Sequence, residues 1–194
     1  MQKNRLEAFS DGVIAIIITI MVLELKIPHE PDIYELFHLF PKFLSYVLSF
    51  LYLAIYWNNH HHLLHTVHRV NGKILWANIH LLFWLSLIPF ATAWSGENNF
   101  AADPVVVYGF ILFMAGLAYF ILSKTIISSH GKDSILASAI GKDFKGTLSV
   151  ILYAVSTPLA YWEPGISMGV YTLVAIMWLI PDKRIEKELS RTVE

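Results

Sequence analysis

The chain contains no cysteine, and only 15% of its 194 residues are charged. Without cysteine the protein has no disulfide, no thiolate metal site and no thiol nucleophile. Soluble domains carry about 25% charged residues, so a charge content this low, with 56% hydrophobic residues, excludes an ordinary soluble domain. The formal net charge of −1 leaves no basic surplus for binding nucleic acid.

Sequence features of enzymes and voltage sensors are also missing. No serine stands with a base at a spacing typical of a nucleophile, no glycine-rich loop is present to hold phosphate, and no carboxylates pair inside an apolar run. We therefore expect neither an enzyme nor a cofactor. No helix repeats arginine or lysine in the manner of a voltage sensor, which predicts a voltage-insensitive protein.

What the chain does have is a series of apolar runs near the length of a membrane span, about 20 residues. These runs predict an all-α integral membrane protein with a single domain over residues 1–194. Prolines bound several of them, because a proline fits poorly inside a helix but well in its first turn. We expect six transmembrane helices, over residues 9–27, 41–67, 74–93, 104–127, 147–161 and 166–180. A cytoplasmic tail over residues 182–194 is expected to follow them.

The basic residues predict how these spans are oriented. Drawn as six spans, the chain places every lysine and arginine except Lys26 and Lys42 on one side of the membrane. Because cytoplasmic loops carry the excess of lysine and arginine, both termini are predicted to be cytoplasmic. The lipid bilayer of the cell membrane is then the expected surroundings of this multi-pass protein.

Charged residues gather where the first apolar run begins, in Arg5-Leu6-Glu7-Ala8-Phe9-Ser10-Asp11-Gly12. Two interpretations stay open. Ser10 or Asp11 could cap a helix that starts there, by accepting hydrogen bonds from free backbone N–H groups. Alternatively, Asp11 and its neighbours form a buried hydrogen-bonded network that holds helices together, since polar groups inside a membrane are costly without partners.

The run behind this stretch contains one stripe of residues at helical spacing. Gly12, Ile16, Thr19 and Leu23 share a helix face, and Ile20 flanks it. If the stripe faces lipid, it belongs to an ordinary membrane helix. If it faces a symmetry axis, rings of isoleucine and leucine would form apolar constrictions, and a ring of Thr19 hydroxyls would help to replace an ion's hydration shell.

Histidines form the other polar group, within residues 60–68. His61, His65 and His68 share a helix face, a spacing that also occurs in zinc sites, but no carboxylate lies among them. Hydrogen-bond partners for Asp11, or groups that respond to pH, fit the cluster better. An alternative function follows, a proton-linked secondary transporter that uses Asp11 and the His60–His68 cluster. Few ionisable residues lie within the spans, which is unfavourable for it.

The pattern Arg5-x-x-x-Phe9-Ser10-Asp11 at the start of the first of six spans resembles the signature of the transmembrane protein 175 family of potassium channels. Further along, Trp57-Asn58-Asn59-His60-His61, Asn78 and Leu87-Ile88-Pro89-Phe90 look like the rest of that family's pattern. The likeness covers essentially the whole chain. A single copy of the signature is similar to prokaryotic members, which implies a homotetramer.

This resemblance implies a passive channel for potassium and other monovalent cations, with the first helix of each subunit lining a central pore. The family's apolar constrictions match Ile16, Ile20 and Leu23, and its selectivity hydroxyl matches Thr19. Its interhelical clamp matches Arg5, Phe9, Ser10 and Asp11, for which His61 and Asn78 are the expected partners. Ala15 stands where some relatives carry serine, so we expect only modest preference for potassium over sodium.

Overall fold

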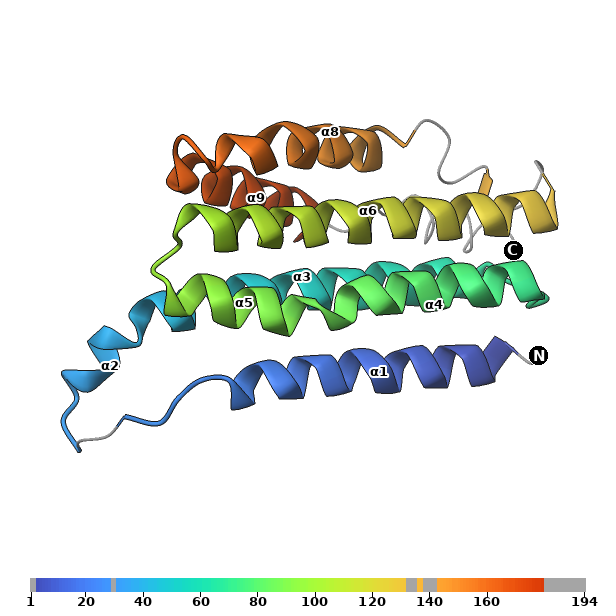
Figure 1. Cartoon of the computed structure of the whole chain (residues 1–194). Coiled ribbons are helices and arrows are strands. Elements are labelled where there is room, and N and C mark those ends of the chain that lie inside the picture. The colour runs from blue at the N-terminus through green and yellow to red at the C-terminus, as the bar shows by residue number, and fades with distance from the viewer. Residues whose placement is uncertain (1–2, 29–30, 132–135, 138–142, 180–194) are drawn as a thin grey trace.

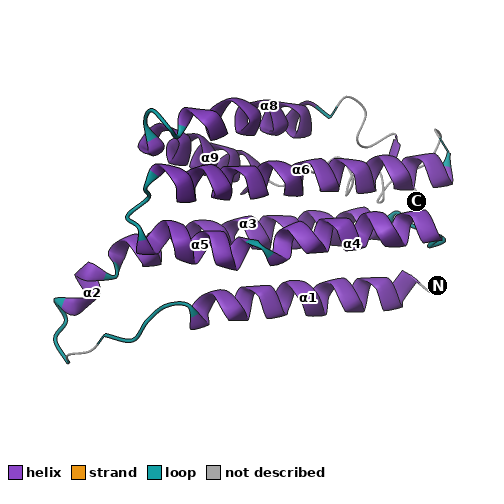
Figure 2. Cartoon of the chain, viewed as in Figure 1, coloured by secondary structure: helices purple, strands orange, loops and turns teal. Residues whose placement is uncertain are grey.

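The computed structural model describes residues 3–28, 31–131, 136–137 and 143–179, and the regular structure in these residues is helical (Figure 2). The predicted basic tail, residues 182–194, lies outside the described residues. The helices, in chain order, are α1 (Lys3–Leu23), α2 (Glu35–His38), α3 (Phe40–His65), α4 (Gly72–Ser86), α5 (Ile88–Glu97), α6 (Ala102–His130), α8 (Phe144–Leu159) and α9 (Pro164–Leu179).

Among the described residues, four stretches of helix are long and apolar enough to cross a membrane: α1, α3, the combined stretch Gly72–Glu97 of α4 and α5, and α6. Helices α8 and α9 are shorter, with 16 described residues each, compared with about 20 in a typical span. The protein is therefore an all-helical membrane protein.

Local sequence explains where the helices begin. Asn71 caps α4, with its side-chain oxygen accepting a hydrogen bond from the Ile74 N–H at 2.9 Å. Asp143 caps α8 in the same way through the Gly146 N–H at 3.0 Å. Pro41 occupies the first turn of α3, where its missing N–H removes no helical hydrogen bond.

The first and third predicted spans differ most from the observed helices. Helix α1 starts at Lys3, well before residue 9, and ends at Leu23 rather than at residue 27. The third predicted span is divided at Leu87 into α4 and α5. Pro89 explains this break, because it has no N–H to donate to the carbonyl one turn earlier.

The helices form successive layers (Figure 1). Helix α1 contacts α3, α4 and α5; α4 and α5 contact α6; and α6 contacts the outer pair, α8 and α9. The start of α1, the α3–α4 connection and the end of α6 lie at one end of the bundle. Lys26 and Lys42 lie near the other end, with the last turn of α5. Helix α1 thus forms one side of the bundle.

Hydroxyl groups rather than charges connect the helices in the interior. Ser49 of α3 is hydrogen-bonded to Tyr108 of α6 at 2.8 Å and to Thr92 of α5 at 2.6 Å. Tyr153 of α8 donates to the Tyr52 hydroxyl of α3 at 3.0 Å. Such bonds satisfy polar groups that have no water to bind inside a membrane.

Gly109 of α6 allows α9 to approach closely. A Cβ atom at this position would overlap the hydroxyl of Tyr171, a fully buried side chain of α9. Membrane helices often use small residues in this way, because packing rather than water exclusion holds them together. The outer helix α9 therefore packs closely against α6 at a position where only glycine leaves enough space.

Candidate functional site: the two faces of the first helix

Helix α1 has one face packed on the bundle and one face that the other described residues leave exposed. The buried residues recur every three or four positions, as expected for one side of a helix: Leu6, Ser10, Ile14, Ile17 and Met21. The predicted stripe lies on the other side. Ile16, Ile20 and Leu23 are 58%, 43% and 80% exposed.

A chain of hydrogen bonds fixes the buried face. Asn78 of α4 donates its Nδ2–H to Ser10 Oγ at 2.9 Å, and its Oδ1 lies 2.6 Å from His60 Nε2 of α3. Because the amide oxygen can only accept, His60 Nε2 carries the proton. All three side chains are buried. We call this the Ser10–Asn78–His60 chain, and it joins three helices.

Asp11 makes a second link, at the edge of the packed face. Its carboxylate accepts a hydrogen bond from the indole N–H of Trp57 on α3, with Nε1 to Oδ1 at 3.0 Å. The Trp57 ring in turn stacks on His61, with ring centroids 6.1 Å apart. At the start of the helix, Lys3 Nζ donates to the His65 carbonyl at 3.1 Å. Helix α1 is thus tied to α3 along its first three turns.

The helix-cap interpretation of Ser10 and Asp11 is wrong. Because α1 begins at Lys3, both residues lie about two turns inside the helix, where backbone N–H groups already have helical partners. The Ser10 hydroxyl donates to the Leu6 carbonyl one turn earlier, at 2.9 Å, which leaves its oxygen free to accept from Asn78.

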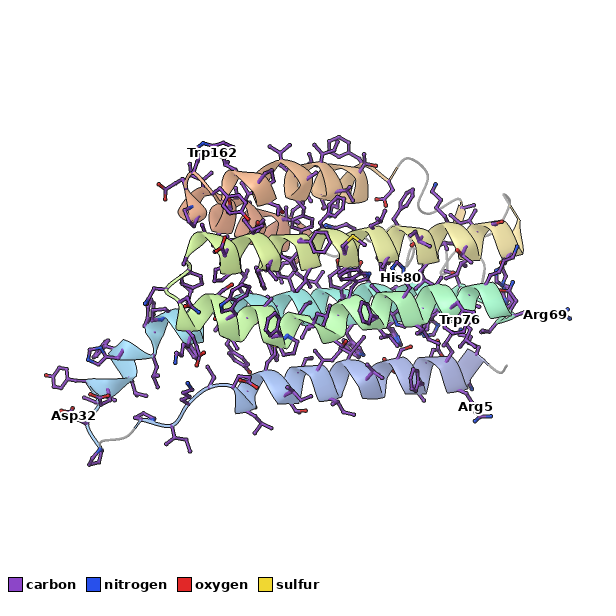
Figure 3. The ribbon with its side chains drawn as sticks, viewed as in Figure 1. Arg5, Asp32, Arg69, Trp76, His80 and Trp162 are labelled. Atoms are coloured by element: carbon purple, nitrogen blue, oxygen red, sulfur yellow. The ribbon has the colours of Figure 1, made fainter. Side chains whose placement is uncertain are left out.

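The residues predicted to form the clamp lie in different places. Ser10, Asp11 and Asn78 take part in the links above, whereas Phe9 is 54% exposed. Arg5 is also exposed, and Figure 3 shows its side chain directed away from the other helices. Within one chain, Arg5 and Phe9 therefore belong to the unpartnered face of α1.

The histidine that joins the Ser10–Asn78 link is His60, whereas His61 was the histidine expected as a partner of the clamp residues. One residue turns an α-helix by about 100°, which places His61 on the exposed side of α3 while His60 is 1% exposed. Helical spacing puts His60 on the same face as Leu53, seven residues earlier, but only the packing of α3 shows that this face is the buried one. The Trp57 link to Asp11 likewise depends on how α3 packs against α1.

The far end of α1 is held by exposed charges, which sequence reasoning missed. Glu97 Oε1, in the last turn of α5, lies 2.6 Å from Lys26 Nζ and 3.5 Å from Lys42 Nζ. The hydrogen bond with Glu97, and then the charge of the same carboxylate, raise the pKa of Lys26 above its ordinary value. These residues are far apart in the sequence, so their spacing does not indicate the pairing.

The exposed stripe is apolar except for Thr19. The Thr19 hydroxyl donates to the Ile16 carbonyl at 2.8 Å, so its oxygen lone pairs remain available as acceptors. A Cβ atom added at Gly12 would meet nothing within 4 Å. Beside the stripe, a groove between α1 and α5 is lined by residues that include Ile16, Ile20 and Phe90.

The histidine segment offers no metal centre in the part of the chain that the structure describes. His61 and His65 lie with ring centroids 4.7 Å apart, but no group of three or more histidine, aspartate or glutamate side chains converges among the described residues. The segment's structural role is clearest at His60, which secures Asn78.

The amino-acid sequence of this chain is similar to those of known potassium channels. A potassium channel of Chryseobacterium sp. (strain P1-3) is 56% identical over 190 residues, which span 98% of this chain and 99% of that protein. Residues 5–89 match the family model described as endosomal/lysosomal potassium channel TMEM175. The chain belongs to the TMEM175 family. The family predicted from the Arg5 to Asp11 signature is thereby confirmed.

The TMEM175 likeness extends to the fold. A crystal structure of a lysosomal potassium-selective channel TMEM175 homolog from Chamaesiphon minutus matches with a TM-score of 0.82 and 29% identity, covering 93% of this chain and 97% of that one. A potassium channel of the same organism is 30% identical over 196 residues, 92% of this chain and 94% of that protein. TMEM175 is a family of ion channels and not of enzymes.

Proposed function

We propose that this protein is a passive, voltage-insensitive cation channel that prefers potassium. Four copies would surround a central pore, with the exposed face of α1 from each copy lining it. The observation that carries the proposal is the division of α1 into two faces. Polar links hold one face on the bundle, while the other presents Ile16, Ile20 and Leu23, which the rest of the described chain leaves exposed.

Rings of these three side chains would form the narrow part of the pore. Apolar constrictions are able to gate conduction by excluding water. Thr19 lies between Ile16 and Leu23 on the same face, and its hydroxyl proton is engaged by a backbone carbonyl. Four Thr19 oxygens would then turn lone pairs, rather than protons, toward a cation, as ion coordination requires.

The proposed topology has six spans, formed by α1, α3, the α4–α5 stretch, α6, α8 and α9, with both termini in the cytoplasm. The distribution of charge along the bundle supports it. Lys3, Arg5 and Lys73 belong to the end at which α1 begins, and Lys26 and Lys42 to the opposite end. The excess of basic residues at the first end is the pattern expected of a cytoplasmic face.

Ion flux through reconstituted vesicles is the deciding experiment. Vesicles containing the protein should release potassium faster than sodium, and the conductance should not depend on the sign of the membrane potential. An intact tetramer that passes neither ion would contradict the proposal. Saturable uptake driven by a pH gradient would instead favour the proton-linked transporter.

The pore-lining face can be mapped separately, because the chain has no native cysteine. Leu23→Cys and Ile16→Cys should react with a small cationic thiol reagent and lose flux. Leu173→Cys is the matched control, since Leu173 is 64% exposed on the outer helix α9. Equal labelling of all three variants would mean that the α1 face meets lipid.

Selectivity offers a test of a single position. Ala15 is exposed on α1, and Ala15→Ser would add a ring of four hydroxyls to the proposed pore. We expect the reversal potential measured between potassium and sodium solutions to move toward the potassium equilibrium potential, because hydroxyl oxygens replace lost hydration. An unchanged reversal potential would place residue 15 outside the selective region.

A further inference from the structure

A groove between α4 and α6 opens at the end of the bundle where α4 begins and α6 ends. Lys73 and Trp76 line it from α4, and Phe120, Lys124 and Ser128 line it from α6. The α6 residues recur at every fourth position and so form one face of the helix. Asn71 Nδ2 donates to Ser129 Oγ at 3.0 Å, which holds the two helices together at the mouth.

The groove is polar at its mouth and apolar below. Lys73 and Ser128 lie near the helix ends. Trp76 lies about one turn from the start of α4, and Phe120 lies more than two turns from the end of α6, where the two antiparallel helices run into the bilayer. Trp76 is 70% exposed. An exposed tryptophan at this depth is typical of the boundary between lipid headgroups and acyl chains.

The charge of the groove is positive. Lys73 and Lys124 are both exposed, and neither forms an ion pair with a described residue. None of the described lining residues is an aspartate or glutamate. Lys124 Nζ lies 5.3 Å from the centroid of the Phe120 ring, so the ammonium group sits where the polar and apolar parts of the groove meet.

We propose that this groove binds an anionic phospholipid. The phosphate lies between Lys73 and Lys124, within reach of the Ser128 hydroxyl, and one acyl chain follows Trp76 and Phe120. A lysine near a membrane surface attracts anionic lipid, and two in one groove add their effects. The apolar lower part of the groove favours a lipid over a free phosphate ion, because only a lipid has an acyl chain that can contact apolar side chains.

This site requires only that α4 and α6 lie in a membrane, and it is separate from ion permeation through α1. Its test therefore needs no flux measurement. Native mass spectrometry of detergent-purified protein, titrated with phosphatidylglycerol or phosphatidylcholine, counts bound lipids without the field of a charged membrane surface. We expect wild-type protein to bind phosphatidylglycerol in preference to phosphatidylcholine.

Lys73→Gln with Lys124→Gln should weaken phosphatidylglycerol binding about 30-fold, roughly fivefold for each lysine. Arg69→Gln is the matched control. It removes one positive charge at the same end of the bundle, from an exposed side chain outside the groove that extends past the helix ends in Figure 3. Its lipid binding should equal that of wild type.

Both lysines are exposed, so the double variant should unfold at the wild-type temperature, and each single variant gives an intermediate affinity as a second check. Equal binding of the two lipids, or undiminished phosphatidylglycerol binding by the double variant, would overturn the proposal. So would complete displacement of the lipid by excess inorganic phosphate, which would reveal a simple anion site.

Discussion

Ile14 and Ile16 are the same residue type, two positions apart on α1, yet their surroundings are opposite. Ile14 is 1% exposed against the bundle and Ile16 is 58% exposed. In a soluble protein such a difference would be visible as an apolar and a polar face. Here both faces are largely apolar, and the packed face is marked instead by a buried polar residue, Ser10, which is hydrogen-bonded to Asn78.

Removal of Asn78 should damage the packed face most. Asn78→Ala leaves the Ser10 hydroxyl oxygen and the His60 Nε2–H buried without their partner. At roughly 1–2 kcal/mol for each orphaned group, the loss of stability is about 2–4 kcal/mol. Thermal unfolding in detergent measures it. A variant as stable as wild type would mean that the Ser10–Asn78–His60 chain does not hold the helices.

The two isoleucines provide a matched pair. Ile14→Ala should lower stability by about 1–3 kcal/mol, toward the low end of the range for soluble cores, because packing is lost but no water is exposed. Ile16→Ala should leave the unfolding temperature nearly unchanged and alter conductance. The comparison fails if both variants lose stability equally, or if only Ile14→Ala changes single-channel current.

Asp11 lies between the two faces and should have an intermediate effect. Asp11→Ala removes the acceptor of the Trp57 indole N–H, at a cost of about 1 kcal/mol for a partly exposed hydrogen bond. Tetramer yield and unfolding temperature should both fall. Trp57→Phe breaks the same bond from the other side, and the double variant should lose less than the sum of the two.

The exposed ion pairs of Glu97 should matter least. Glu97→Gln removes its pairing with Lys26 and Lys42, and the change in unfolding temperature should vanish in high salt, which screens exposed charges. Because the pKa of Lys26 is raised, the pair contributes at pH values below the ordinary lysine pKa and is lost as pH rises through the raised value. A large effect at neutral pH and high salt would contradict this ranking.

The sequence was enough to predict the fold class and the family. Apolar runs and the placement of lysine and arginine indicated a helical membrane protein, because lipid forces backbone groups into helices. Long segments were easier to predict than their ends. The Leu87 break needed knowledge of how Pro89 affects its own turn, and the early start of α1 needed the tertiary contacts of Lys3 with α3.

The partners of α1 were harder to predict than its stripe. Ile16, Thr19 and Leu23 follow from helical spacing alone, whereas choosing between His60 and His61 depends on the rotation of α3, which packing decides. The Lys26–Glu97 pair depends on where a loop returns to the bundle. Periodicity within one helix is a local property, and pairing between helices is not.

The break at Leu87 separates the two anchors of α1. Asn78 belongs to α4 and Glu97 to α5. The first turns of α1 and the loop after α1 are therefore bound to two different helices, which without the break would be one continuous helix. A continuous helix would transmit any bending at one anchor to the other. Because the helical hydrogen bond that Pro89 would donate is missing, α4 and α5 are able to bend relative to each other, so the contacts at the two ends of the stripe need not move together.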